Sequence, residues 1–182
     1  MAKNIVYFDL ETQKSAQEVG GWGNIQKMLM SIGVTYSTRT GRYSIYAEHE
    51  VEQLIHELSR ADLVVGFNHQ RFDFTVLEHY TVFDFKQLPT LDLMLDIEEK
   101  IGHRIGLDAV AEASLGVNKT AEGLQALQWW KQGKVMEIAE YCCYDVKATK
   151  LVHEYGAANG LVKFKSNRTF LLTEVPVKWS LA

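Results

Sequence analysis

Near its start the chain reads Asn4-Ile5-Val6-Tyr7-Phe8-Asp9-Leu10-Glu11-Thr12, a mostly apolar run that ends in two carboxylates. The apolar run over residues 4–10 predicts a buried strand. Positions i and i+2 of a strand point to the same face, so Asp9 and Glu11 are expected on one side. A strand that turns polar where it meets water would explain the pair equally well, and these two residues alone do not decide between the two interpretations.

The remainder of the chain alternates between strand-like and helix-like segments. Two β-rich runs flank Thr38-Arg39-Thr40-Gly41 and predict a hairpin, a continuous apolar run predicts a buried strand, and a further short strand follows Pro89. The predicted strands are residues 4–10, 32–37, 42–47, 62–67 and 89–93. A loop and a short helix are expected over 11–30. A further helix is expected around Leu54, Ile55 and Leu58, which recur at helical spacing, and others over 72–80, 107–115, 123–131 and 135–155. The tail over 161–179 alternates weakly and predicts an edge strand or a loose cover.

This order of elements indicates the fold class. A strand and a hairpin followed by strands that alternate with helices fit an α/β layer with a mixed central sheet, in which an antiparallel meander leads into parallel strands flanked by helices. We find no internal repeat and no Pro/Ser-rich linker among the 182 residues, so a single domain over 1–182 is expected.

Composition narrows the class of protein. Apolar residues make up 47% and charged residues 23%, the balance of an ordinary globular protein, and the net charge is −4. An acidic chain is not a basic arm that binds nucleic acid through bulk electrostatics. The charge does not exclude a nuclease, because bound metal ions can meet the phosphate instead.

The two cysteines, Cys142 and Cys143, are adjacent, so a disulfide bond between them could not stabilise a fold of this size. We find neither a signal peptide nor an apolar run long enough to cross a membrane. A reducing, cytoplasmic setting without membrane contact is therefore predicted.

Two further groups of residues can carry chemistry. Asn68, Phe72 and Asp73 come where a buried strand ends and a helix begins, which places Asp73 in the first helical turn. Such an aspartate also has a purely structural explanation, since a helix N-terminus favours a carboxylate. Tyr141 and Asp145 are related by i and i+4, so they share one face of the long predicted helix.

The ordered set is more informative than its parts. Carboxylates gathered at one sheet edge repel one another by about 4 kcal/mol per pair at 4 Å and an effective dielectric of about 20. Divalent cations remove this cost, and ligands that are all oxygen favour Mg²⁺ or Mn²⁺. Two such ions can activate a water and clamp a phosphodiester.

With these residues assembled, the chain resembles the DEDD exonucleases, in the subgroup whose third motif carries tyrosine (DEDDy). The motif Asp-x-Glu is matched by Asp9 and Glu11. The second motif of the proofreading exonuclease domains of family B DNA polymerases, Asn-x-x-x-Phe-Asp, is matched by Asn68, Phe72 and Asp73, and the third, Tyr-x-x-x-Asp, by Tyr141 and Asp145. The resemblance implies a ribonuclease H-like fold and two divalent cations, Mg²⁺ or Mn²⁺.

The resemblance also implies roles for individual residues. Asp9, Glu11 and Asp145 would hold the catalytic metal, with Asp9 bridging to a second ion that Asp73 serves through water. Tyr141 would orient the attacking water. Thr12, Asn68 and Phe72 would touch the terminal nucleotide. Three segments match no family motif: Gly20 to Met30, Gly102-His103-Arg104 and Trp129-Trp130-Lys131. Packing is the favoured interpretation of the two adjacent tryptophans, with at least one of them partly exposed.

The function that follows is a metal-dependent 3′–5′ exonuclease acting on single-stranded DNA or RNA, or on frayed ends, to release nucleoside monophosphates. An endonuclease on the same fold remains an alternative. A non-catalytic module that binds nucleic acid or assists assembly is another, although such a module has no reason to keep repelling carboxylates together.

Overall fold

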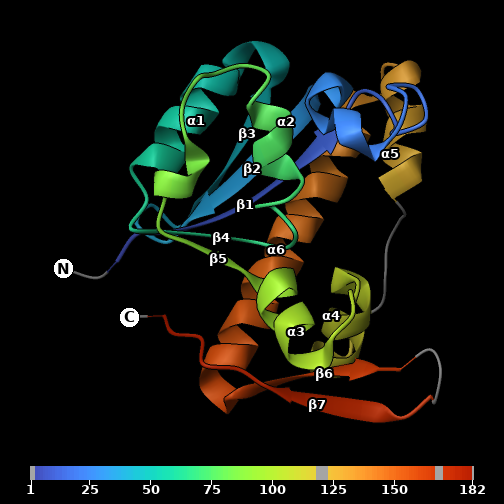
Figure 1. The fold of residues 1–182 in the computed structure, drawn as a ribbon. Coiled ribbons are helices and arrows are strands. Elements are labelled where there is room, and N and C mark those ends of the chain that lie inside the picture. Colours follow the sequence, from blue (N-terminus) through green and yellow to red (C-terminus); the bar gives the residue numbers. More distant parts are fainter. Residues whose placement is uncertain (1–2, 118–122, 167–169, 182) are drawn as a thin grey trace.

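A computed structural model describes residues 3–117, 123–166 and 170–181. Its central sheet has five strands in the order β3-β2-β1-β4-β5 (Figure 1). The strands are β1 (Ile5–Thr12), β2 (Met30–Ser37), β3 (Arg42–Ala47), β4 (Leu63–Gly66) and β5 (Thr90–Asp92). β1, β2 and β3 pair antiparallel, whereas β4 pairs parallel to both β1 and β5. The predicted mixed sheet, a meander followed by parallel strands, is confirmed.

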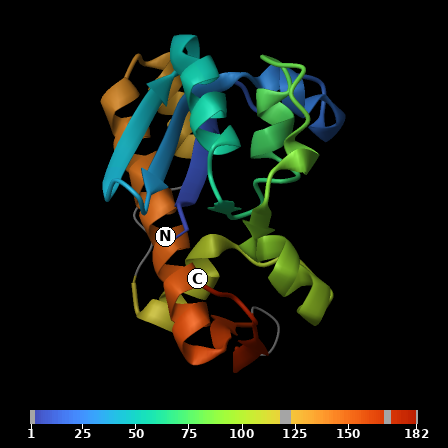
Figure 2. The same ribbon diagram turned by 90° about the vertical axis from the view of Figure 1, so that its left-hand side faces the viewer.

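Helices cover both faces of this sheet (Figures 1 and 2). The α-helices are α1 (Val51–Ser59), α2 (Asp73–Leu77), α3 (Leu93–Ile101), α4 (Leu107–Leu115), α5 (Gly123–Lys131) and α6 (Val135–Asn159). Short 3₁₀ helices are η1 (Trp22–Met28), η2 (Glu48–Glu50) and η3 (Phe85–Gln87). None of the helices in the described ranges is long and apolar enough to cross a lipid bilayer.

Side chains of β1 alternate between two apolar cores. Phe8 and Leu10 lie in the core that includes buried residues of α1 and α2. Ile5 and Tyr7 lie in the other core, which includes buried residues of α6. Because both faces are covered, the strand is apolar almost throughout rather than alternating with polar residues. Asp9 and Glu11 follow Tyr7 at intervals of two residues, so they lie on the same face of β1 as Tyr7, toward α6.

The segment after β5 differs from the prediction. A short strand or strand-like turn was expected over 89–93, and α3, which the sequence did not predict, begins at Leu93 directly after β5. Asp92 caps this helix, since its side chain accepts hydrogen bonds from the backbone N–H groups of Met94 and Leu95. The apolar run Leu93-Met94-Leu95 has no period that distinguishes a strand end from a buried helix start.

The tail was predicted as an edge strand or a loose cover, and the edge strand is wrong. β6 (Leu161–Lys165) and β7 (Leu172–Pro176) pair only with each other, as a separate two-stranded sheet beneath α4 and α6 (Figure 1). Trp179 follows β7, and its indole N–H donates a hydrogen bond to the Asp96 carboxylate of α3 at 2.8 Å. Its ring lies so close to Gly156 of α6 that any Cβ there would collide with it.

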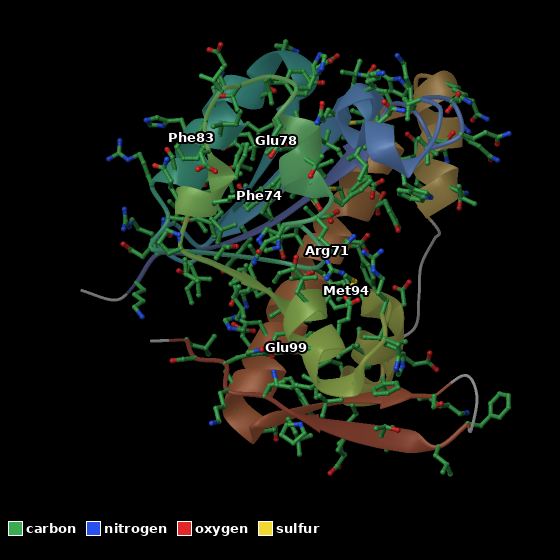
Figure 3. All side chains as sticks on the ribbon, viewed as in Figure 1. Arg71, Phe74, Glu78, Phe83, Met94 and Glu99 are labelled. Atoms are coloured by element: carbon green, nitrogen blue, oxygen red, sulfur yellow. The ribbon has the colours of Figure 1, made fainter. Side chains whose placement is uncertain are left out.

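Two helix boundaries also differ. α2 ends at Leu77, short of the expected residue 80, whereas α6 runs on to Asn159, past the expected residue 155. Below α2, Arg71 forms an ion pair with Glu98 of α3 at 2.5 Å. Figure 3 shows Arg71 between α2 and α3, on which Met94 and Glu99 are labelled. This ion pair links the start of α2 to α3.

Candidate active site

Three carboxylates meet where the end of β1 passes α6. Asp9, Glu11 and Asp145 each offer an oxygen, and these oxygens all lie within 4.8 Å of one another. Period-two alternation puts Asp9 and Glu11 on the face of β1 that packs against α6, and Asp145 comes from α6 itself. The sequence prediction that this strand pair and this helix residue come together is therefore reproduced in the structure.

The strand is irregular at this point. The pairing of β1 with β2 shifts register between Glu11 and Thr12, where Glu11 is opposite Ile32 but Thr12 is opposite Met30. Bulges of this kind bend a strand and redirect its side chains. The extra residue is Ser31 of β2, so the bulge lies on the neighbouring strand, opposite the end of β1 that carries the carboxylates.

Tyr141 lies one turn before Asp145 on α6 and shares its face. Loss of contact with water raises the pKa of its hydroxyl, and the negative charges of Asp145, Glu11 and Asp9 and a hydrogen bond to Asp145 raise it further. Tyr141 therefore keeps its proton at neutral pH. Its ring packs edge-on against Trp129 of α5, with centroids 6.3 Å apart.

Asp73 begins α2 and is buried, with 3% of its surface exposed. Its Oδ1 accepts a hydrogen bond from the backbone N–H of Leu10 at 3.0 Å, which ties α2 to β1 between the two acidic residues of that strand. Burial raises the pKa of Asp73 to about 7, although backbone hydrogen bonds oppose the shift. Asp73 is not a member of the 4.8 Å group, but it lines the same pocket.

Loss of solvation and mutual repulsion both raise the pKa values in the group. Burial raises the pKa of Asp9, and the charges of Asp73, Asp145 and Glu11 raise it further. Burial likewise raises the pKa of Glu11, with Asp145 as the next cause. The buried Cys142 thiol donates to Asp9 Oδ2 at 3.3 Å, the one contact that counters the shift of Asp9. The thiol is thus a neutral donor behind the site.

The donor set fits a hard divalent cation. Carboxylate oxygens are the ligands that Mg²⁺ and Mn²⁺ prefer, and the three oxygens are already close enough to share one ion. A cation between them would replace repulsion with attraction in a site shielded from water. Asp9, Glu11 and Asp145 are the residues that could hold it.

A pocket of about 850 Å³ opens beside the carboxylates. The connection from β1 to β2, the start of α2 and part of α5 line it, and Figures 1 and 2 show the connection and α5 at the same end of the molecule. The three predicted substrate-binding residues Thr12, Asn68 and Phe72 all line this pocket, as do Asp9, Glu11 and Asp73. The Thr12 hydroxyl donates to the carbonyl of Lys14 at 3.1 Å.

The loop that carries Asn68 is held from behind by a buried carboxylate. Asp92 accepts the backbone N–H of Asn68 at 2.8 Å and that of Gln70 at 3.0 Å. His69, fully buried, lies 3.4 Å from Asp92 through Nδ1 and contacts Thr90 through Nε2. Asn68 itself has a φ of 66°, in the left-handed region, and its side-chain oxygen has no hydrogen-bond partner within the described protein.

Sequence patterns did not reveal every residue near the site. Trp129, interpreted as a packing residue, is half-buried and contacts Tyr141, and Cys142 contacts Asp9. Trp22 also lines the pocket, although its segment matched no motif. The only sequence signal for Trp22 was the Gly20-Gly21 pair before it, which indicates a loop but not its direction.

Fold and site together define an α/β protein with a mixed five-stranded sheet and a carboxylate cluster at the end of its first strand. The family model described as the RNase H superfamily matches residues 6–156. The chain belongs to the RNase H superfamily.

Comparison with solved structures agrees with this membership. The chain is similar to a family B DNA polymerase from the hyperthermophilic archaeon Pyrobaculum calidifontis, with a TM-score of 0.65 and 14% sequence identity. The match covers 86% of this chain but only 25% of the polymerase. The chain therefore shares the fold of one part of that enzyme. No curated protein sequence gives a match.

Proposed function

We propose that the chain is a 3′–5′ exonuclease that hydrolyses terminal phosphodiesters of nucleic acid and depends on two divalent cations, Mg²⁺ or Mn²⁺. The observation that carries this proposal is the convergence of Asp9, Glu11 and Asp145 within 4.8 Å, beside a pocket that Asp73 also lines. The DEDDy motif order supports the exonuclease over other activities of the superfamily.

Each residue has a proposed task. Asp9, Glu11 and Asp145 bind the catalytic cation, and Asp73 serves a second one. When bound, these cations supply the positive charge that meets the phosphodiester and lower the pKa of a bound water. Tyr141, protonated and fixed on α6 beside Asp145, orients the attacking water.

Thr12, Asn68 and Phe72 position the terminal nucleotide in the pocket. The unpartnered side-chain oxygen of Asn68 supports this assignment, since a buried polar atom without a partner costs about 1–3 kcal/mol unless something pairs with it. Asp73, held by the N–H of Leu10, keeps the start of α2 and the end of β1 in one arrangement.

The proposal extends to setting and organisation. We propose that residues 1–182 act as one exonuclease domain in the cytoplasm. Cys142 and Cys143 are both free thiols, as a reducing compartment would keep them. Cys142 donates to Asp9, so its oxidation would disturb the site.

The test uses single-stranded DNA and RNA labelled at the 5′ end and incubated with Mg²⁺ or Mn²⁺. A ladder that shortens from the 3′ end, requires the metal and is abolished by Asp145→Asn is the expected result. Glu137→Gln is the matched control, because Glu137 is an exposed carboxylate on the same helix and should cut normally.

Two outcomes would redirect the proposal. Cleavage that continues when the 3′ end is chemically blocked would identify an endonuclease instead. Tight binding of metal and strand without any cleavage, on DNA and RNA alike, would favour a non-catalytic binding module.

A further inference from the structure

Trp22 lies on the connection between β1 and β2 and is unusually exposed for its size. Its relative exposure is 70%, and the one aromatic ring in contact with it among the described residues is Phe72, edge-on at a centroid distance of 6.4 Å. Aromatic side chains usually contribute to stability by burying 150–250 Å². Packing of the protein alone therefore does not account for this tryptophan.

The segment that carries Trp22 is nevertheless well supported. Its base is closed by backbone hydrogen bonds from Gln13 N–H to the Leu29 carbonyl at 2.9 Å and from Lys14 N–H to the Met28 carbonyl at 3.1 Å. Gly21, just before Trp22, has a φ of 112°, which a residue with a Cβ rarely adopts. The backbone thus presents the indole in a defined place.

A second anchor links this segment to α5. Glu18 and Lys131 form an ion pair at 2.7 Å. Both residues line the pocket, as do Trp22 from the connection and Leu124 from α5. The ion pair therefore joins two walls of the same pocket.

The pocket combines two chemical surfaces. Trp22, Phe72 and Leu124 supply apolar area from three separate elements, and Leu124 is 69% exposed. Asp9 and Glu11 of the carboxylate group lie in the same pocket. A ligand that is flat and apolar at one end and carries a phosphodiester at the other matches this combination, and a nucleotide has that form.

We propose that Trp22, together with Phe72, is a specificity-determining residue that stacks on the unpaired base at the 3′ end of a single strand. This inference rests on the proposed function, because the carboxylates place the scissile phosphodiester. Stacking on an aromatic ring tolerates every base, so no sequence preference follows. A paired terminal base is already covered by its partner and neighbour, so a strand with a free end is preferred over a blunt duplex.

The test measures binding rather than cleavage. Fluorescence anisotropy with a 5′-labelled single strand in Ca²⁺, with the probe checked on a gel for integrity, gives the Kd of the parent protein, Trp22→Ala and Trp22→Phe. Each is measured with an intact strand, a strand abasic at its 3′ terminal residue and one abasic at its 5′ terminal residue. Trp22→Ala should weaken binding of the intact strand about tenfold, the size expected for loss of one stacked base.

The decisive comparison is between the variant and the abasic strand. If Trp22 stacks on the 3′ base, Trp22→Ala should not weaken binding of the 3′-abasic strand further, the 5′-abasic strand should behave as the intact one, and Trp22→Phe should restore most of the affinity. Phe170→Ala is the matched control, since Phe170 is 72% exposed and lies on the β6–β7 connection. Its Kd should equal that of the parent.

Equal losses with intact and 3′-abasic strands would overturn the inference, because Trp22 would then act on something other than the base. No loss in Trp22→Ala would overturn it as well. Failure of the proposed function looks different: a parent protein that binds with this 3′-base dependence but never cuts in Mg²⁺ or Mn²⁺ would leave the inference standing. Unchanged thermal melting of Trp22→Ala would show that the variant is folded.

Discussion

Two acidic regions of this molecule differ in what surrounds their oxygens. Asp92, at the end of β5, accepts four backbone N–H groups, those of Asn68, Gln70, Met94 and Leu95. The carboxylate oxygens of Asp9, Glu11 and Asp145 instead lie within 4.8 Å of one another, and the pKa values of Asp9 and Glu11 are raised. Asp92 is buried whereas the three clustered carboxylates are half-buried, so the two regions differ in exposure as well as in their partners.

The difference lies in the partners that the fold provides. Backbone donors satisfy Asp92 completely, so it stabilises the loop and helix around it. The charges of the neighbouring carboxylates instead raise the pKa values of Asp9 and Glu11, and a bound cation would stabilise the group in its ionised form. Asp73 is intermediate, because one backbone N–H group, that of Leu10, reaches its Oδ1.

Asp9→Asn should give the largest effect and the clearest contrast. We expect the cleavage rate to fall by about 10²–10³-fold, as when one charge-stabilising group is lost from an active site. Without metal, the variant should be at least as stable as the parent, because a source of repulsion with Asp73, Asp145 and Glu11 is gone. Urea denaturation in EDTA checks stability, and the labelled-strand ladder checks the rate.

A variant that lost stability in EDTA together with activity would show that Asp9 is a structural residue like Asp92. Asp9 and Asp92 would then both stabilise the fold, and the two acidic regions would not differ in role.

His69 makes the stability of the Asp92 region depend on pH. Burial lowers the pKa of His69 from 6.5 to about 4, although the charge of Asp92 acts in the opposite direction. Above pH 6.5 the imidazole is neutral in both states, so this stability is fully present there. As the pH falls toward 4 only the unfolded chain gains this proton, so His69 subtracts about 3 kcal/mol from the free energy of unfolding, whereas carboxylates with a raised pKa, such as Asp73, act in the opposite direction.

Urea denaturation at pH 7 and pH 4.5 isolates the His69 contribution as the difference in pH dependence between the parent and His69→Gln, which should lack most of this drop. His79→Gln is the control, since His79 is exposed, and it should retain the pH dependence of the parent. Equal pH dependence in His69→Gln and the parent would assign the drop to other groups.

Asp92→Asn should lower stability by a smaller amount. The amide keeps one acceptor oxygen but presents donors to backbone N–H groups that need an acceptor, so the free energy of unfolding should fall by about 2 kcal/mol. Stabilisation by added Mn²⁺ should persist, because the metal-binding oxygens belong to the other region. Thermal melts with and without Mn²⁺ separate the two effects, and a lost Mn²⁺ response would mean that the regions are coupled.

The sequence predicted one of these regions much better than the other. Strand and helix periods determine the face that Asp9, Glu11 and Asp145 each occupy, and the resemblance of the ordered motifs to the DEDD exonucleases implied that the three share one metal. Asp92 could not be interpreted, since its partners are backbone groups of a loop more than twenty residues earlier, and such contacts leave no pattern in side-chain identities. α3 was missed for another reason: Asp92 caps it locally, but the apolar run Leu93-Met94-Leu95 that follows has no period that distinguishes a strand end from a helix start.

The tail and Trp22 were hard to predict for a different reason. β6 and β7 alternate weakly because each strand buries few side chains, those of Val162 and Phe164 in β6 and of Val175 in β7, so their sequence also fits an edge strand of the main sheet. Trp22 follows two glycines whose positive φ values direct the segment, and a glycine pair indicates a loop without indicating where it leads.

The smallest predicted effect concerns how the carboxylate region is supported. Where Asp92 is held by hydrogen bonds, Tyr141 is held partly by the ring of Trp129, at a centroid distance of 6.3 Å. Trp129→Ala should let Tyr141 reorient and lower kcat about tenfold with little change in KM, because misplacing a reacting group slightly has effects of this order or larger. Trp129→Phe should restore most of the rate.

Trp130→Ala serves as the matched control, because the neighbouring Trp130 is also half-buried against the core on the α6 side. It should reduce the melting temperature without changing kcat of the folded protein. Similar kcat values for Trp129→Ala and Trp130→Ala would indicate that α5 contributes stability alone, and that Tyr141 is positioned by α6 and its hydrogen bond to Asp145 without help from Trp129.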